Sequence, residues 1–390
     1  MPSIQYSGSK VCLVGHPFAP IGMGEHVRSS WRAVNAAGYA PTIRDIYGLN
    51  SRTDLDYERE LAPQLTDRLS ERLNIFHING DEIEQAVPHL NDANFDSSYN
   101  VIYPAWELSR YPTDWARQLE RFDEVWAPSA FIQESIAHTV SIPVLHMPLA
   151  VEVKLSGMLS RRHFGIPEHA YAFLFFFDFG SYSARKNPEA VVDSVERLVA
   201  RNPNAPIHCV IKFKGGDESS AQYKALNARI EALGEYATKI TAVLSDNEIK
   251  NLVRACDCFV SLHRSEGFGR GMAEAMRLGR LTIGTGYSGN LDFMTKDTAH
   301  LVRYQPVALE PNSYPYWQGQ IWAEPDIAHA VELMELAIGD RKGSRAMAER
   351  ARRHMRQNFS ARAVGIRYAK RISEVLDGAA KTTASGKKRK

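Results

Sequence analysis

The sequence predicts an α/β protein of two domains, each built around a parallel β-sheet. At 390 residues the chain is long for one hydrophobic core, so two domains of about 150–200 residues are the default. Short apolar runs typical of buried strands alternate with helical patterns from end to end, as in parallel sheets covered by helices. The two halves follow a similar plan, which indicates two Rossmann-like units rather than one decorated domain.

The composition is that of a soluble globular protein, with 44% hydrophobic, 10% aromatic and 24% charged residues. A net charge of +2 is too small to imply nucleic acid as a partner. The apolar run 171–177 is far too short to span a bilayer, and the N-terminus lacks the pattern of a secretory signal. We interpret the four cysteines as core thiols in a reducing cytoplasm, because their spacing is not that of metal ligands: Cys12, Cys209, Cys256 and Cys258.

In the first half, strands are expected at 11–15, 41–44, 74–78, 101–104, 124–127 and 144–146. Helices are expected between these strands, notably at 24–37, where Gly38 serves as the C-terminal cap, and at 129–138. The apolar periodicity then lapses at 149–167, which predicts a domain boundary in this segment.

In the second half, strands are expected at 171–177, 207–213, 240–243, 258–262, 282–283 and 300–302. Ser245 and Glu248 form a capping box that opens a helix ending at Ala255. Three late helices are expected at 325–338, 345–358 and 361–376.

The segment 263–274, His-Arg-Ser-Glu-Gly-Phe-Gly-Arg-Gly-Met-Ala-Glu, carries two carboxylates eight residues apart, Glu266 and Glu274. A glycine loop follows a buried strand and leads into a helix expected at 271–278, which Gly279 ends. Backbone N–H groups at the helix start then lie between the two carboxylates and suit an anion. Acceptors for hydroxyls on either side of donors for phosphate are what a nucleotide-sugar needs. The alternative is an ordinary strand–loop–helix joint with one solvated glutamate.

This segment resembles the Glu-x7-Glu motif of retaining GT-B glycosyltransferases, the large family four group of sugar transferases. The resemblance implies that Glu266 contacts hydroxyls of the donor sugar and that Glu274 contacts the ribose hydroxyls. It also implies that the residues between them bind the donor: Gly267, Phe268 and Gly269.

The same resemblance implies a GT-B fold, in which two Rossmann-like domains face each other across a cleft and the second holds most of the donor. We expect an acceptor domain at 1–150, a donor domain at 151–358 and a helix at 359–377 that returns to the first domain. Residues 378–390 form a polar tail ending in four basic residues, for which we expect disorder and a weak hold on anionic lipid.

Two adjacent cations, Arg185 and Lys186, precede a helix that opens at Pro188 and runs through Val199. Fixed positive charge at this place suits a diphosphate leaving group, whose negative charge grows in the transition state. In the resembling family an Arg/Lys pair has this role. Lys186 matches the lysine, whereas the arginine usually lies several residues earlier, and Lys212 or Lys214 could supply the second charge. A solvated basic helix start is the alternative.

Gly22 and Gly24 follow the first strand at a helix start, where glycine lets a ligand approach the backbone. Their spacing is not the dinucleotide fingerprint. The segment resembles the family's first glycine loop, which lies against the donor phosphate and the acceptor, and a plain turn is the alternative. In the second half, Ser288, Gly289 and Asn290 open a short helix expected near the sugar and its phosphate.

Four residues at or after strand ends in the first half are candidates for contact with the sugar or acceptor: His77, Asp81, Trp106 and Glu107. In an open parallel sheet this edge is where ligands bind. Many relatives place a histidine at the position of Trp106 and Glu107, so that histidine has no assigned counterpart. Trp106 suits a sugar face and Glu107 an acceptor hydroxyl, and a core tryptophan is the alternative.

Residues 103–129 and 284–293 resemble a branch that assembles bacterial polysaccharides and often uses GDP-mannose. No DxD-type metal pair is present where a donor diphosphate would need it, and we expect neither a metal nor a cofactor. The expected activity is therefore metal-independent, retaining transfer of a hexose from a nucleoside diphosphate sugar to a glycan or lipid-linked oligosaccharide at the inner membrane face. GDP-mannose is the first choice of donor, with UDP-glucose or a UDP-N-acetylhexosamine second. A nucleotide-sugar 2-epimerase and a non-catalytic sugar-binding relative are the alternatives.

Overall fold

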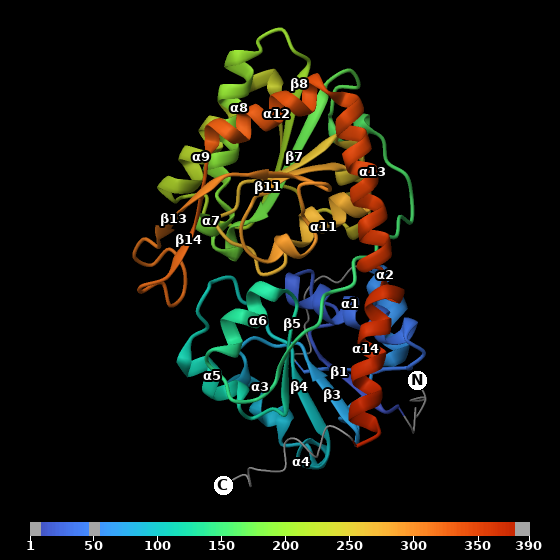
Figure 1. Cartoon of the computed structure of the whole chain (residues 1–390). Coiled ribbons are helices and arrows are strands. Elements are labelled where there is room, and N and C mark those ends of the chain that lie inside the picture. The colour runs from blue at the N-terminus through green and yellow to red at the C-terminus, as the bar shows by residue number, and fades with distance from the viewer. Residues whose placement is uncertain (1–8, 47–54, 379–390) are drawn as a thin grey trace. The chain divides into compact units, whose positions relative to one another are not determined.

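The structure, a computed structural model, describes residues 9–46 and 55–378 and divides into two compact units. The first unit extends to Glu152 and resumes at Gln357, and the second is Val153–Arg356. Each contains a six-stranded parallel sheet (Figure 1). In the described ranges, no helix combines the length and apolarity that a bilayer crossing requires.

The first unit has the strand order β2-β1-β3-β4-β5-β6. Its strands are β1 Val11–Gly15, β2 Thr42–Asp45, β3 Leu73–Phe76, β4 Tyr99–Ile102, β5 Glu124–Ala127 and β6 Val144–His146. Its helices are α1 Gly22–Ala36, α2 Leu55–Leu61, η1 Ala62–Gln64, α3 Ile83–Leu90, α4 Ala93–Ser97, α5 Thr113–Leu119, α6 Ala130–Ala137 and α14 Ala361–Leu376. The six expected strands are all present, with boundaries that differ by at most two residues.

Helix α14 packs against α1 in the first unit, as the sequence predicts for the last helix. Gly365 allows this approach, because a Cβ at this position would lie 2.5 Å from the carbonyl oxygen of Ala33. Tyr368 is fully buried, with its ring 4.8 Å from that of Trp126. Arg371 forms an ion pair with the buried carboxylate of Glu124. The last helix is therefore part of this core.

The second unit has the strand order β12-β11-β10-β7-β8-β9 and a separate hairpin, β13-β14. The strands are β7 Tyr171–Asp178, β8 Ile207–Lys214, β9 Ala237–Ile240, β10 Cys258–Ser261, β11 Leu281–Thr285, β12 His300–Val302, β13 Tyr304–Ala308 and β14 Ile321–Pro325. The α-helices are α7 Ser183–Lys186, α8 Pro188–Arg201, α9 Ala221–Ala232, α10 Asp246–Ala255, α11 Arg270–Arg277, α12 Ile327–Gly339 and α13 Arg341–Asn358. The 3-10 helices are η2 Arg161–Phe164, η3 Phe179–Ser181, η4 Gly234–Tyr236 and η5 Gly289–Asp292.

Successive side chains of β7 pack on opposite faces of this sheet. Phe173, Phe175 and Phe177 join the buried cluster that includes α8, α9 and α12. Phe176 points to the other face, where its ring and that of Phe259 pack near α11. Strict alternation along an apolar strand is why both faces of a parallel sheet are covered by helices.

Three sequence expectations are corrected in this unit. The strand expected at 240–243 lies at Ala237–Ile240, and Val243 is exposed beyond it. The helix expected from 325 starts at Ile327, because Pro325 pairs with Tyr304 in the β13-β14 hairpin. This hairpin was not expected at all. The capping box of Ser245 and the short helix after Ser288 are confirmed.

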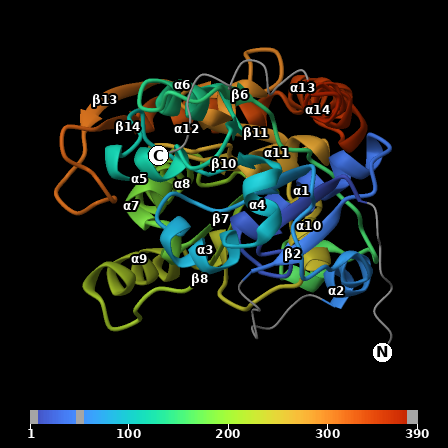
Figure 2. The same ribbon diagram turned by 90° about the horizontal axis from the view of Figure 1, so that it is seen from below.

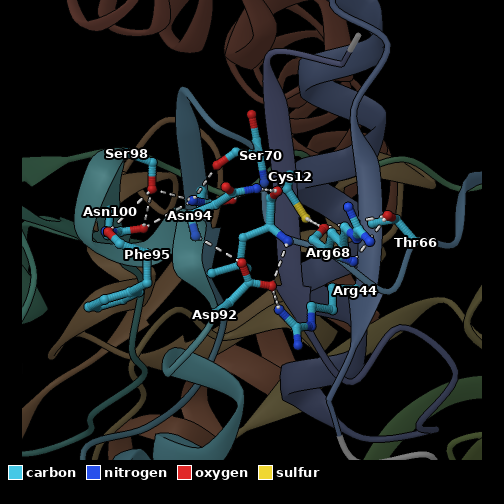
Figure 3. Close-up of polar contacts among 12 residues, drawn as sticks. Cys12, Arg44, Thr66, Arg68, Ser70, Asp92, Asn94, Phe95, Ser98 and Asn100 are labelled. Carbon is cyan, nitrogen blue, oxygen red and sulfur yellow. Dashed lines mark hydrogen bonds and ion pairs between the residues drawn. The ribbon is translucent and has the colours of Figure 1, made fainter. Parts of the chain in front are cut away.

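A buried polar network stabilises the amino ends of β3 and β4 (Figure 3). The Asn74 side chain accepts from the Ser70 N–H at 2.8 Å and donates to Ser98 Oγ at 2.8 Å and Asn100 Oδ1 at 3.0 Å. Asp92 accepts from Arg44 Nη1 at 2.8 Å nearby. Buried polar groups that have such partners are structural. The burial of these polar side chains at the amino ends of β3 and β4 is therefore explained without a ligand.

Candidate functional site

The candidate residues of the second unit lie in loops that follow β7, β10 and β11. Because β10 pairs with both β7 and β11 in parallel, the carboxyl ends of these strands lie side by side. Lys186 comes from α7 after β7, Glu266 from the loop after β10, and Ser288 from the loop after β11. This edge is where open α/β sheets bind ligands.

Glu266 lies between two cations. Its Oε1 is 2.5 Å from Lys186 Nζ, and its Oε2 is 3.1 Å from Arg185 Nη1. Burial by itself would raise the pKa of Glu266, which is 7% exposed, but the charges of Lys186 and Arg185 lower it to about 2. Glu266 is therefore an ionised hydrogen-bond acceptor at neutral pH.

The two cations differ in accessibility. Arg185 is 4% exposed and also donates to the carbonyl oxygens of Ser265 at 3.0 Å and Ser181 at 3.3 Å. The Lys186 side chain is 22% exposed. This geometry favours a positioning role for Arg185, which fastens the loop that carries Glu266, and leaves Lys186 as the cation that a ligand can reach.

The loop after β11 holds the main chain of Glu266 through two hydrogen bonds. Ser288 Oγ accepts from the Glu266 N–H at 2.8 Å, and the Gly289 N–H donates to the Glu266 carbonyl at 2.9 Å. A Cβ on Gly289 would lie 1.9 Å from the carbonyl oxygen of Gly267, so only glycine fits here. Buried His263 lies 3.1 Å from Asn290 Oδ1 and links the two loops. Neither a role for His263 nor this link was predicted from the sequence.

Glu274 is buried in α11, which begins at Arg270 after Gly269 in the left-handed conformation. Its Oε1 is 3.8 Å from Arg270 Nη1. Phe268 is buried against Phe293, with ring centroids 5.3 Å apart, so its ring serves the core. Any ligand contact from Gly267 to Gly269 must therefore come from the backbone.

Lys212 and Lys214 lie near the carboxyl end of β8, on the strand beside β7. Lys212 is buried, and its pKa is lowered by this burial and by the charge of Lys214. Lys214 forms an ion pair with Asp178 at 3.2 Å. The structure records no contact between Lys212 and the carboxylate that Lys186 binds, within the part of the chain that it describes.

The candidates of the first unit separate into buried and accessible residues. Trp106 is buried, donates to the Arg110 carbonyl at 3.1 Å and packs edge-on against neighbouring aromatic rings. His77 is also fully buried, and burial lowers its pKa to about 3. Neither ring faces solvent, which argues against the sugar contact expected of them. Asp81 is exposed and Glu107 is half-buried, so both can reach a ligand.

The packing of the first loop requires a glycine at one of its two glycine positions but not at the other. A Cβ on Gly24 would lie 2.1 Å from the carbonyl oxygen of Ala19, so loop packing alone explains this glycine. A Cβ on Gly22 would meet no described atom within 4 Å. Beside this loop, His16 Nε2 lies 3.1 Å from Glu82 Oε1. In the sequence, the only indication of this pair is that His16 directly follows an expected strand.

A cavity of about 460 Å³ lies at the amino edge of the second sheet. Arg161 there pairs with Asp257 at 2.7 Å, and Arg254 donates to the Leu159 carbonyl. These arginines hold the segment before β7 in place. None of the candidate residues predicted from the sequence lines this cavity, whose lining is Met158, Leu159, Ser160, Arg161, Glu168, Arg254, Ala255 and Arg280.

Comparison with solved structures defines the class of fold. The chain resembles the Anabaena protein HepE, solved in complex with UDP and glucose, with a TM-score of 0.67 at 12% identity over 93% of this chain and 99% of that one. It resembles sucrose-phosphate synthase from Thermosynechococcus elongatus with a TM-score of 0.67 at 14% identity over 94% of this chain and 99% of that one. The protein therefore has the GT-B fold of two Rossmann-like units.

The family follows from the sequence comparisons. Residues 161–354, nearly all of the second unit, match the family model of glycosyl transferases group 1, so this segment is a glycosyltransferase domain of that family. Mannosylfructose-phosphate synthase of Agrobacterium fabrum is 29% identical over 112 residues, 28% of this chain. The match spans a quarter of that enzyme, 25% of its length.

Proposed function

We propose that the protein transfers a hexose from a nucleoside diphosphate sugar to a hydroxyl of a glycan or a lipid-linked oligosaccharide, with retention of configuration and without a metal. The observation that carries this proposal is the position of Glu266 between Lys186 and Arg185. These three residues lie at the carboxyl edge of the second sheet, within the segment that matches the glycosyltransferase family model.

Each group of the cluster has a role in this reaction. The ionised Glu266 accepts hydrogen bonds from hydroxyls of the donor sugar, each contributing about 1.5–3 kcal/mol. Lys186 stabilises the charge that grows on the departing diphosphate, an interaction that is strongest in the transition state. Glu274 accepts from the ribose hydroxyls. When the donor binds, the ion pair between Lys186 and Glu266 is thus replaced by contacts of Lys186 with the diphosphate and of Glu266 with the sugar hydroxyls.

Retention follows from front-side attack in this proposal. The bond from the acceptor oxygen to the anomeric carbon forms on the face from which the diphosphate oxygen departs, and the acceptor proton moves to that oxygen. Glu266 is a poor nucleophile here, because two cations hold its pKa near 2. A glycosyl-enzyme trapped on Glu266, Asp81 or Glu107 would refute this mechanism.

GDP-mannose is the first donor to test and UDP-glucose the second. The mannosyl donor is favoured by the resemblance of residues 103–129 and 284–293 to the polysaccharide branch. The HepE structures contain UDP and UDP-glucose, which supports inclusion of a uridine donor.

The first test of the proposal is thermal stabilisation by a panel of nucleotide-sugars, since a ligand that binds the folded state raises Tm. The donor that stabilises most is then incubated with acceptors, and the products are identified. Interconversion of the free nucleotide-sugar without an acceptor would show a 2-epimerase. Binding without transfer or hydrolysis would show a non-catalytic relative.

We also propose that this protein is cytoplasmic and that it contacts the inner face of the membrane peripherally. Of the basic tail expected at 378–390, residues 379–390 lie outside the described residues. About 1 kcal/mol per basic residue near an anionic surface would give weak binding. Co-sedimentation with phosphatidylglycerol vesicles, compared with phosphatidylcholine vesicles and with a chain ending at Gly378, tests this point.

A further inference from the structure

The hairpin β13-β14 is an addition to the plan of the second unit. It leaves the sheet after β12 and returns directly before α12, and its strands pair only with each other in the described chain. Figures 1 and 2 both show it projecting from the body of this unit. None of the hairpin's residues belongs to the buried cluster that β7 shares with α8, α9 and α12.

The hairpin contacts the loops that follow β7, β10 and β11, which carry the candidate site. The Ala323 N–H donates to the Arg264 carbonyl at 3.0 Å, two residues before Glu266. The rings of Tyr314 and Tyr182 lie 4.7 Å apart, which links the hairpin to the start of α7. Tyr304 lies 5.3 Å from Tyr287 in the loop after β11. The ribbon is therefore continuous with the candidate site.

The composition of the ribbon differs sharply from that of the whole chain. Glu310 and Glu324 are its only acidic or basic residues between positions 304 and 325, although 24% of the whole chain is charged. Glu324 is paired with Arg264 at 2.5 Å. The same stretch is rich in aromatic and amide side chains: Tyr304, Gln305, Asn312, Tyr314, Tyr316, Trp317, Gln318 and Gln320. Aromatic faces combined with a few neutral polar groups suit an uncharged hydroxylated ligand rather than a phosphate.

Three tyrosines present their rings to solvent on this ribbon and beside it. Tyr182, Tyr304 and Tyr316 are 46%, 39% and 41% exposed. Tyr182 and Tyr316 also have positive φ values, 59° and 54°, a strained backbone conformation for a tyrosine. We call Tyr182, Tyr304 and Tyr316 the aromatic rim.

We propose that the aromatic rim binds pyranose rings of the neutral glycan acceptor by stacking, while the cluster of Glu266 and Lys186 holds the donor. The proposal rests on the proposed transferase function, because an acceptor glycan must come close to the donor sugar. The apolar C–H face of a pyranose packs on a tyrosine ring, and the amides of the ribbon can pair with its hydroxyls.

The test measures binding of two neutral probes, maltotriose and mannotriose, by saturation-transfer difference NMR. We expect wild-type protein to bind at least one probe, and the double variant Tyr304→Ala/Tyr316→Ala to bind it about tenfold more weakly. Tyr316→Phe keeps the ring and should stay within about twofold of wild type. Tyr236→Ala is the matched control, because Tyr236 lies at the amino end of β9, on the opposite edge of the sheet.

Each variant is first shown to be folded by its circular dichroism and Tm. The same variants are then titrated with GDP and UDP, and nucleotide affinity should stay unchanged in Tyr304→Ala/Tyr316→Ala. Loss of nucleotide affinity instead would identify the rim as a base-stacking surface and overturn the proposal. Absence of binding by both probes, or binding that the double variant retains, would also overturn it.

These readouts separate the rim from the donor site. If wild type binds a trisaccharide through the rim but binds no nucleotide-sugar, the proposed transferase function fails while the saccharide surface stands. If nucleotide-sugars bind and are turned over while the double variant keeps its acceptor KM, the rim proposal fails alone.

Discussion

Replacement of Lys186 by alanine should slow turnover far more than it destabilises the fold. The side chain is partly exposed, and Arg185 still pairs with Glu266 at 3.1 Å after the change. We therefore expect a loss of only about 1–2 kcal/mol in the free energy of unfolding. Loss of the charge that faces the departing diphosphate should lower kcat about 10²–10³-fold, equivalent to about 2.7–4 kcal/mol of transition-state stabilisation.

The assay measures kcat and the donor KM with the nucleotide-sugar that gives the largest thermal stabilisation, and urea unfolding gives the stability of the same samples. Lys239→Ala is a matched control, because Lys239 pairs with Glu231 at 2.7 Å on β9, away from the candidate site. The control should keep the wild-type kcat. A Lys186→Ala enzyme whose kcat stays within threefold of wild type would refute the leaving-group role.

Three further predictions concern the same site. Glu274→Ala should weaken donor binding about tenfold or more by calorimetry and leave kcat nearly unchanged, and an unaltered Kd would contradict the ribose contact. Glu266 has its pKa lowered from 4.5 to about 2 on folding, so its stabilisation is complete above about pH 4.5 and is lost as the pH falls towards 2. Urea unfolding from pH 6 to 3 should therefore show a steeper loss of stability for wild type than for Glu266→Gln. Gly289→Ala should cost about 1–3 kcal/mol and abolish donor binding, because the added Cβ would meet a backbone oxygen at 1.9 Å, whereas Gly339→Ala, with no described atom within 4 Å, should leave both unchanged.

Much of the scaffold could be predicted because its signals are local. β1, β5, β6 and α14 have the expected boundaries, since apolar runs and the caps around them are contained in a few residues. The hairpin β13-β14 lacked such signals. Its strands carry Pro306 and Pro325, which are typical of turns, and four of the five residues of β13 are exposed.

The site was predictable in its residues but not in its pairings. The spacing of Glu266 and Glu274 is visible in the sequence, whereas the contact of Glu266 with Lys186 joins residues 80 positions apart. The direction of a side chain at a strand end is equally hidden. Trp106 follows a strand as expected, and His77, expected within the end of a strand, lies directly after β3. Both side chains turn into the core, because local periodicity does not fix the face beyond the last paired residue.

The return of α14 to the first unit has a consequence for the order in which the protein forms during synthesis. At about 5–20 residues per second, the ribosome needs roughly 10–45 s after Glu152 to make this helix, so the second unit can fold before the first is complete. Until then the side of α1 that receives Gly365 stays uncovered, and Glu124 lacks the guanidinium of Arg371. A nascent chain stalled before Ala361 should therefore engage chaperones through its amino-terminal half, and release of the last helix should end that engagement.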